Sequence, residues 1–253
     1  MVWYINTSPE WLKQIKDSTE LENTLKNYIQ TVGVHFKGKV ASWDVVNEAF
    51  DNKNGAIRTE IQDTKGRSVL NLGGILGKDY VARMFQYAHQ ADPNAWLFYN
   101  EYGQETSPKK LEAVLAMVAD FKRRGIPIAG LGLQMHININ TSNEGIENAL
   151  QKCAETGILV HISELDIGMN GGKKKDFVVT QDLLDKQQQK YKFVVSAYKR
   201  LVPAKQQYGI TMWGVGDADS WIPGFCQCTD FPLLFDQNYS NKQIYQGFLE
   251  GLK

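Results

Sequence analysis

Trp43-Asp44-Val45-Val46-Asn47-Glu48-Ala49-Phe50 is the stretch of sequence that decides the fold. Its β-branched pair, Val45 and Val46, favours a buried extended strand. The strand ends at an amide and a carboxylate, Asn47 and Glu48, so polar groups are expected where the strand leaves the sheet. In a parallel barrel the carboxyl-terminal ends of the strands carry the active site. This stretch therefore predicts a barrel strand with functional side chains at its end.

A second apolar run follows the same plan further along the chain. It spans residues 158–167 and reads Ile-Leu-Val-His-Ile-Ser-Glu-Leu-Asp-Ile, which presents Glu164 and Asp166. Two Glu residues, each at the end of its own buried strand, are what acid/base and nucleophilic catalysis at a sugar carbon requires. The pair predicts a glycoside-cleaving site if the two strand ends meet.

The composition limits the classes of partner. The 253 residues include 28 basic and 28 acidic side chains, so the net charge is zero. A balanced chain gives no reason to expect nucleic acid or an anionic membrane as a partner. No apolar run approaches the roughly 20 residues that span a bilayer. The length suits one large α/β barrel domain or two small domains, and we expect residues 1–253 to form a single catalytic domain.

The three cysteines are too few for a disulfide framework. Cys226 and Cys228 are separated by one residue, which we interpret as a poor spacing for a disulfide. No second pair with zinc-like spacing accompanies them, so they are also a weak metal signature. We therefore expect free thiols at these positions and at Cys153, and neither a metal site nor a cofactor.

Strand-like and helix-like segments alternate along the whole chain, which predicts a parallel sheet with crossover helices. No glycine-rich phosphate loop follows any predicted strand, and this argues against a doubly wound nucleotide-binding fold. Polar and aromatic side chains at most strand ends favour a barrel with a sugar-type site instead. The predicted strands lie at 1–5, 40–47, 96–100, 128–136, 159–167 and 208–213. The predicted helices lie at 11–34, 80–90, 107–121, 143–155, 180–201 and 241–252.

Eight strands close such a barrel, and six are countable here. The chain also starts at Met1 directly in strand-like sequence, without a basic segment or a cleavage site for secretion. We therefore expect an α/β fold of the (β/α)8 TIM-barrel type that is incomplete, two strands short and cut at its front.

Five motifs occur in a fixed order along the chain, and together they are specific. They are Trp-Asp-Val-Val-Asn-Glu-Ala (43–49), Gly-Leu-Gln-Met-His-Ile (132–137), Ser-Glu-Leu-Asp-Ile (163–167), Thr-Met-Trp-Gly-Val-Gly-Asp-Ala-Asp-Ser-Trp (211–221) and Pro-Leu-Leu-Phe-Asp (232–236). In this order they resemble the family 10 glycoside hydrolases, endo-β-1,4-xylanases on a (β/α)8 barrel. The resemblance covers the whole chain from Met1, aligned to the family's third strand onward, which implies that the first two strands are the absent ones.

The resemblance implies the two catalytic residues of a retaining xylanase. Glu48 matches the acid/base and Glu164 matches the nucleophile. A retaining mechanism needs two carboxyl groups about 5–5.5 Å apart. Like charges at that separation do not ionise together cheaply, so Glu48 is expected to keep its proton near neutral pH.

The same resemblance implies residues that bind and orient. Asn47 matches the residue that hydrogen-bonds the sugar 2-hydroxyl, His136 is expected to hydrogen-bond Glu164, and Asp166 is expected to hold that imidazole. Further residues expected to line the sugar site are Gln134, Trp3, Asn6, Tyr102, Trp213 and Trp221. The three tryptophans are expected to form apolar walls, because sugar rings pack their C–H faces on aromatic faces.

The chain departs from the family pattern at several positions. Tyr4 stands where His is usual, Asn6 where Gln is usual, and Glu101 where Asp is usual. The contacts of the second glycone subsite and one His of the central subsite have no counterpart, so another segment would have to supply them. Lys173–Lys175 is interpreted as a solvated loop, and Trp43 and Trp96 are interpreted as core residues.

Three interpretations of the function remain open. The first is retaining endo-hydrolysis of β-1,4-xylosidic bonds, with xylan or a xylo-oligosaccharide as the partner. The second is hydrolysis of another β-1,4-glycan, such as cellulose or mannan. The third is an inactive carbohydrate-binding fragment, whose open barrel edges would favour a strand-exchanged dimer or a missing N-terminal segment that completes the barrel. The resemblance and a polymeric substrate imply a secreted protein.

Overall fold

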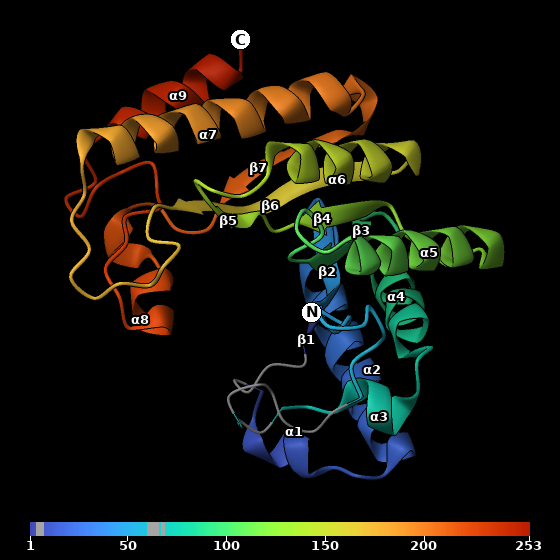
Figure 1. The fold of residues 1–253 in the computed structure, drawn as a ribbon. Helices are drawn as coiled ribbons and strands as arrows, with labels where there is room; N and C mark the ends of the chain where they lie inside the picture. Colours follow the sequence, from blue (N-terminus) through green and yellow to red (C-terminus); the bar gives the residue numbers. More distant parts are fainter. Residues whose placement is uncertain (4–7, 60–65, 67–68) are drawn as a thin grey trace. The chain divides into compact units, whose positions relative to one another are not determined.

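The structure is a computed structural model that describes residues 1–3, 8–59, 66 and 69–253 (Figure 1). The chain divides into two compact units. The first consists of Met1–Glu101 and Ser107–Gly132, and the second of Tyr102–Thr106 and Leu133–Lys253. The predicted α/β class, with parallel strands and intervening helices, is confirmed in both units.

The first unit is a sheet covered by helices. Strand β2 pairs in parallel with β1 on one side and with β3 on the other, and β4 follows β3 in the strand order. The strands are β1 (Val2–Trp3), β2 (Ser42–Asn47), β3 (Trp96–Glu101) and β4 (Gly130–Leu133). The helices are α1 (Glu10–Gln14), α2 (Ser18–Phe36), α3 (Leu72–Leu76), α4 (Tyr80–Ala91) and α5 (Pro108–Arg124).

Local sequence explains where the helices of this unit begin and end. The Asp17 side chain accepts a hydrogen bond from the Glu20 N–H and so caps α2. Ser107 does the same for α5, Pro108 occupies its first turn, and Gly125 ends it in the left-handed conformation. The buried residues of α2 fall on one helical face, which packs towards α4.

The second unit is built around one long strand. Strand β6 (Leu159–Gly168) pairs in parallel with β5 (His136–Asn138) and with β7 (Gln207–Met212). Residues 162–170 are all buried, as expected for a strand covered on both faces. The helices are α6 (Asn143–Glu155), α7 (Gln181–Leu201), α8 (Ile222–Cys226) and α9 (Gln243–Gly251), with 3-10 turns η1 (Ala204–Gln206) and η2 (Asp217–Asp219). Figure 1 shows α7 and α9 side by side.

Three details of the predicted elements are corrected. The helix predicted at 11–34 is two helices, because Ile15 is extended and Asp17 starts α2 as its cap. The strand predicted at 128–136 is interrupted between β4 and β5, where Met135 has a φ of 58°. Trp96, predicted in the core, is 49 % exposed because it is the first residue of β3.

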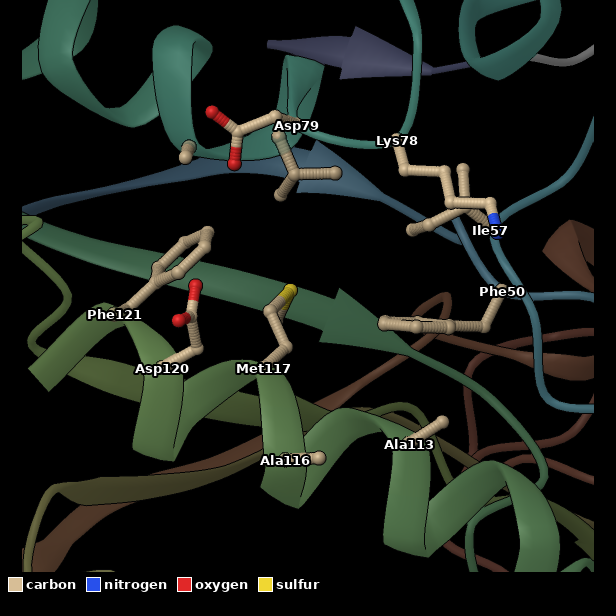
Figure 2. A pocket seen from close by; sticks show the side chains of 11 residues that line it. Phe50, Ile57, Lys78, Asp79, Ala113, Ala116, Met117, Asp120 and Phe121 are labelled. Carbon is tan, nitrogen blue, oxygen red and sulfur yellow. The ribbon is translucent and has the colours of Figure 1, made fainter. Parts of the chain in front are cut away.

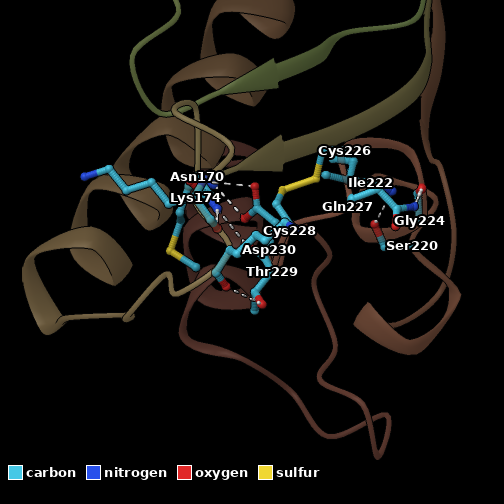
Figure 3. The surroundings of a disulfide bond; sticks show 12 residues. Asn170, Lys174, Ser220, Ile222, Gly224, Cys226, Gln227, Cys228, Thr229 and Asp230 are labelled. Atoms are coloured by element: carbon cyan, nitrogen blue, oxygen red, sulfur yellow. Dashed lines mark hydrogen bonds between the residues drawn. A yellow bond between two sulfur atoms is a disulfide. The ribbon is translucent and has the colours of Figure 1, made fainter.

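The prediction of free thiols is wrong for two of the three cysteines. Cys226 and Cys228 form a disulfide (Figure 3). Cys226 ends α8, and Gln227 turns the chain in a left-handed conformation with a φ of 55°. The turn leaves the two Cα atoms 5.2 Å apart, inside the range that a disulfide requires. Cys153 is a free thiol, and its burial in α6 raises its pKa to about 12.

Within the described ranges, no helix is both long enough and apolar enough to cross a membrane.

Candidate active site

In the second unit, three of the predicted side chains form one hydrogen-bonded cluster. The His136 imidazole lies with Nδ1 2.8 Å from Asp166 Oδ2 and Nε2 3.1 Å from Glu164 Oε2. Glu164 and Asp166 are two residues apart on β6, so both side chains lie on the same face of the strand. His136 lies opposite Asp166 in the register of β5 and β6. Strand pairing therefore brings together groups that are about 30 residues apart in sequence.

The cluster carries a positive charge on its imidazole. Burial of His136 opposes the charged form, but hydrogen bonds and the negative charges of Asp166 and Glu164 outweigh burial and raise its pKa to about 9. At neutral pH the ring is therefore an imidazolium, and both of its N–H groups donate to carboxylates. This fixes the ring orientation between the two strands.

Aromatic side chains border the cluster. Trp221 Nε1 donates to Asp166 Oδ2 at 2.8 Å, and its ring centroid lies 5.1 Å from that of His136. Trp213 lies 6.4 Å from the same imidazole, measured between ring centroids. Trp213 and Trp221 are 46 % and 37 % exposed, so their faces are open to a ligand. Phe225, which sequence reasoning missed, lies 4.9 Å from the Trp221 ring and is also exposed.

The backbone at the break between β4 and β5 supports this arrangement. Gln134 is buried, and its carbonyl oxygen accepts a hydrogen bond from the Glu164 N–H at 3.2 Å. The Met135 carbonyl accepts from the Asp166 N–H at 3.4 Å. The left-handed conformation of Met135 is unusual for a residue with a Cβ, and such strain is often found at functional sites.

In the first unit, Glu48 occupies the position after the end of β2. It is only 9 % exposed and has a φ of 57°, which is again left-handed. Its N–H donates to the Asn100 carbonyl at 3.0 Å, and its own carbonyl accepts from Arg58 Nε at 3.0 Å. A left-handed residue other than glycine costs roughly 1–2 kcal/mol, so neighbouring contacts must hold it.

Asn47, directly before Glu48, is positioned by an amide from the next strand. Asn100 Nδ2 donates to Asn47 Oδ1 at 2.9 Å, and Asn100 is itself buried. Trp3 lies opposite Asn47 in the register of β1 and β2. Asn6 lies outside the described residues, as does the side chain of Trp3. Tyr102, which belongs to the second unit, is half-buried.

A separate apolar pocket lies in the first unit, between α4 and α5 (Figure 2). Its volume is about 290 Å³, and none of the predicted site residues lines it. Its apolar wall includes Phe50, Met117 and Phe121, and Asp79 and Asp120 lie at its rim. Arg124 bridges these two carboxylates.

Among residues 1–3, 8–59, 66 and 69–253, no group of three or more His, Cys, Asp or Glu side chains could hold a metal ion.

Comparison with known proteins identifies relatives across the whole chain. The family model described as Glycosyl hydrolase family 10 matches residues 1–251. Endo-1,4-beta-xylanase A of Cellvibrio japonicus (strain Ueda107) is 34 % identical over 274 residues, which is all of this chain and 43 % of that protein. The chain thus spans less than half the length of this relative.

Solved structures agree with the sequence relatives. A mutant of Xylanase10C from Cellvibrio japonicus in complex with xylopentaose gives a TM-score of 0.88 at 33 % identity, covering 99 % of this chain and 52 % of that one. TsXylA, an intracellular xylanase from Thermoanaerobacterium saccharolyticum JW/SL-YS485, gives a TM-score of 0.83 at 33 % identity. The match covers 97 % of this chain and 73 % of that one. The predicted (β/α)8-barrel fold is confirmed by this likeness.

Proposed function

Because the chain belongs to glycosyl hydrolase family 10, we propose that it hydrolyses internal β-1,4-xylosidic bonds of xylan with retention of configuration. The observation that carries this proposal is the cluster of Glu164 and Asp166 on β6 with His136 on β5. It presents a carboxylate held by an oriented imidazolium beside two exposed tryptophans, which suits a sugar ring and its anomeric carbon.

In the proposed reaction, Glu164 attacks the anomeric carbon and Glu48 protonates the departing glycosidic oxygen. The bond to the leaving sugar breaks as the bond to the Glu164 oxygen forms, giving a covalent glycosyl-enzyme. Glu48 then takes a proton from water, which attacks the same carbon and releases Glu164. Glu48 directly follows β2, whereas Glu164 lies within the buried part of β6. Each residue is 9 % exposed, which supports these roles.

The other predicted residues receive supporting roles. Asn47, held by Asn100, binds the sugar 2-hydroxyl. His136 and Asp166 orient Glu164, while Gln134 and Tyr102 line the site. The faces of Trp213 and Trp221 pack on sugar rings. Trp3, as an apolar wall, and Asn6 are assigned to the sugar site from the family resemblance alone. The ligand is xylan or a xylo-oligosaccharide, and we propose that the protein acts on it outside the cell.

The two carboxyl roles are tested with azide as an external nucleophile. We expect E164A to lose the release of reducing ends from xylan by at least about 10³-fold, because no covalent intermediate forms. With an aryl β-xylobioside of a good leaving group, azide should rescue E164A and give the α-azide. The E48A variant should retain activity on the aryl β-xylobioside, and in the presence of azide it should give the β-azide.

The stereochemistry of the azide product, read by NMR, decides the assignment. A β-azide from E164A would reverse the two roles, and full activity of E164A on xylan would exclude it as the nucleophile. Reducing-end assays on xylan, mannan and carboxymethylcellulose side by side separate xylan from the other β-1,4-glycans. Xylan binding without hydrolysis by the unmodified chain would favour the interpretation as an inactive binding fragment.

A further inference from the structure

A fully buried ion pair in the first unit contacts the segment that follows Glu48. Glu101 is the last residue of β3 and Lys110 lies in the first turn of α5. Lys110 Nζ is 2.8 Å from Glu101 Oε1, and neither side chain has any exposed surface. Removing two charges from water costs several kcal/mol per ion, so a buried pair is weak evidence for added stability. Its contacts point to another role.

The contacts of the pair converge on the segment directly after Glu48. Glu101 Oε2 accepts hydrogen bonds from the Tyr99 hydroxyl at 2.6 Å and from the Phe50 N–H at 3.2 Å. The Tyr99 hydroxyl in turn accepts from the Ala49 N–H at 2.9 Å. The two backbone N–H groups that follow Glu48 are therefore both held by the Tyr99–Glu101 arrangement.

Lys110 extends the same arrangement to one further residue. Its Nζ donates to Asn52 Oδ1 at 2.6 Å as well as to Glu101. Burial lowers the pKa of Lys110, and the negative charge and hydrogen bond of Glu101 oppose that effect. Glu101 thus partly offsets the effect that burial has on Lys110.

Glu48 needs support of this kind because its backbone is left-handed. On its N-terminal side, its own N–H is bonded to the Asn100 carbonyl. On its C-terminal side, Ala49 and Phe50 are bonded to Tyr99 and Glu101. The backbone around Glu48 is therefore held on both sides by β3.

We propose that Glu101 and Lys110, acting through Tyr99, are positioning residues that hold the Glu48 carboxyl in line with the glycosidic oxygen it protonates. This inference rests on the acid/base role assigned to Glu48 under the proposed function. It predicts that a disturbed pair impairs proton donation to the leaving group, and does so more than it impairs attack at the anomeric carbon.

Two substrates separate these steps. An aryl β-xylobioside with a 2,4-dinitrophenolate leaving group needs little proton donation, whereas the phenyl analogue depends on it. In Y99F, which deletes one hydroxyl, we expect kcat/KM for the phenyl substrate to fall about tenfold with KM little changed. A misplacement of about 1 Å can cost about 10²-fold, so this is a moderate effect. In the same variant, kcat/KM for the dinitrophenyl substrate should fall less than about threefold.

A matched pair of double variants tests the ion pair itself. E101L/K110M removes both charges and the acceptor oxygen, while E101Q/K110M removes both charges and keeps an acceptor for the Phe50 N–H and the Tyr99 hydroxyl. Neither variant leaves a buried charge unpaired, so both should keep a cooperative thermal transition. We expect kcat/KM for the phenyl substrate to fall about 10- to 100-fold in E101L/K110M, with no matching fall for the dinitrophenyl substrate. E101Q/K110M should recover most of that loss.

A control pair in the same unit guards against a general effect of stability. Arg83 Nε lies 2.6 Å from Glu22 Oε1, between α2 and α4, and the variant E22Q/R83M removes that pair. We expect it to lower the melting temperature without changing the ratio of the two kcat/KM values. A purely structural pair would leave the ratio of the two kcat/KM values at the wild-type level in Y99F and in E101L/K110M. That result would overturn the proposal.

The E48A variant is assayed beside these, so that the two proposals fail differently. Selective loss of the phenyl substrate in E48A, with no selective loss in Y99F or E101L/K110M, contradicts the positioning role alone. Equal loss of both substrates in E48A contradicts the acid/base role and overturns both proposals.

Discussion

At the scale of single residues, environment gives two histidines opposite properties. The His136 ring is paired with Asp166 and Glu164, and its pKa is raised to about 9. His161 lies on the same strand as Glu164, but burial dominates there and lowers its pKa to about 4. Its Nε2 lies 2.8 Å from Thr211 Oγ1. Residue type alone therefore does not predict which histidine is charged.

The charge on His136 predicts how stability depends on pH. The folded protein keeps a proton on His136 up to about pH 9, whereas an unfolded histidine releases it near 6.5. The stabilising contribution is therefore complete below pH 6.5, and it is lost as the pH rises through 9. It amounts to roughly 3 kcal/mol at most, because each pKa unit corresponds to about 1.4 kcal/mol.

Urea unfolding of the wild type and of H136N at a series of pH values measures this contribution. We expect the difference between the two free energies of unfolding to shrink between pH 6.5 and 9. Other groups that titrate at high pH cancel in the difference. If the free energies of unfolding of the wild type and of H136N changed in parallel between pH 6.5 and 9, His136 would not be charged in the folded protein.

At the scale of elements, the loop that follows β7 is tied to the end of β6. Asp230 accepts hydrogen bonds from the N–H groups of Met169 and Asn170, directly after the strand that carries Glu164 (Figure 3). The disulfide between Cys226 and Cys228 lies just before Asp230, and Trp221 just before α8. The loop thus links Trp221, which borders the His136 cluster, to the strand that carries Glu164, the proposed nucleophile.

Loss of the disulfide should therefore loosen the Trp221 loop more than it destabilises the fold. The ring closed by Cys226 and Cys228 is short, so the expected loss of stability in C226S/C228S is only about 1–2 kcal/mol. We expect a larger relative effect on the affinity for xylo-oligosaccharides, measured by calorimetry in the E164A background. Equal affinity with and without the disulfide would show that α8 holds Trp221 unaided.

Element by element, the sequence was informative where spacing alone carries the signal. Glu164 and Asp166 share a face because they are two apart on a strand, and Ser107-Pro108 marks the start of α5. The disulfide was missed because it depends on a left-handed Gln227, which no local pattern specifies. The split of the predicted 11–34 helix was missed for a similar reason, since Asp17 caps α2 in the middle of an amphipathic pattern.

At the scale of the whole molecule, the two proposed catalytic residues lie in different compact units, Glu48 in the first and Glu164 in the second. The family and the barrel fold were predictable from five ordered motifs. The network of Tyr99, Glu101 and Lys110 was not, because its contacts join residues that no motif links. The expectation that the chain forms one catalytic domain stays a prediction, as does that of a strand-exchanged dimer or a missing N-terminal segment.

A ligand that binds the folded chain and not the unfolded chain should stabilise it. We expect xylopentaose to raise the melting temperature of E164A in one cooperative step, with about 2.7 kcal/mol of added stability at a ligand concentration 100 times Kd. Cellopentaose serves as the control. Two transitions of which only one responds would indicate binding to a single unit. Size-exclusion chromatography of the same samples reports whether the protein is a monomer or an exchanged dimer.

The left-handed backbone at Glu48 has a consequence for evolution as well as for catalysis. Glycine would relax this position, so the E48G protein should be more stable than E48A by about 1 kcal/mol. The amino acid with the least backbone strain at this position is thus glycine, which cannot donate a proton. Under the proposed function, a lineage no longer selected for xylan cleavage would be free to drift towards glycine at this site. It would gain stability as it lost the proposed proton donor.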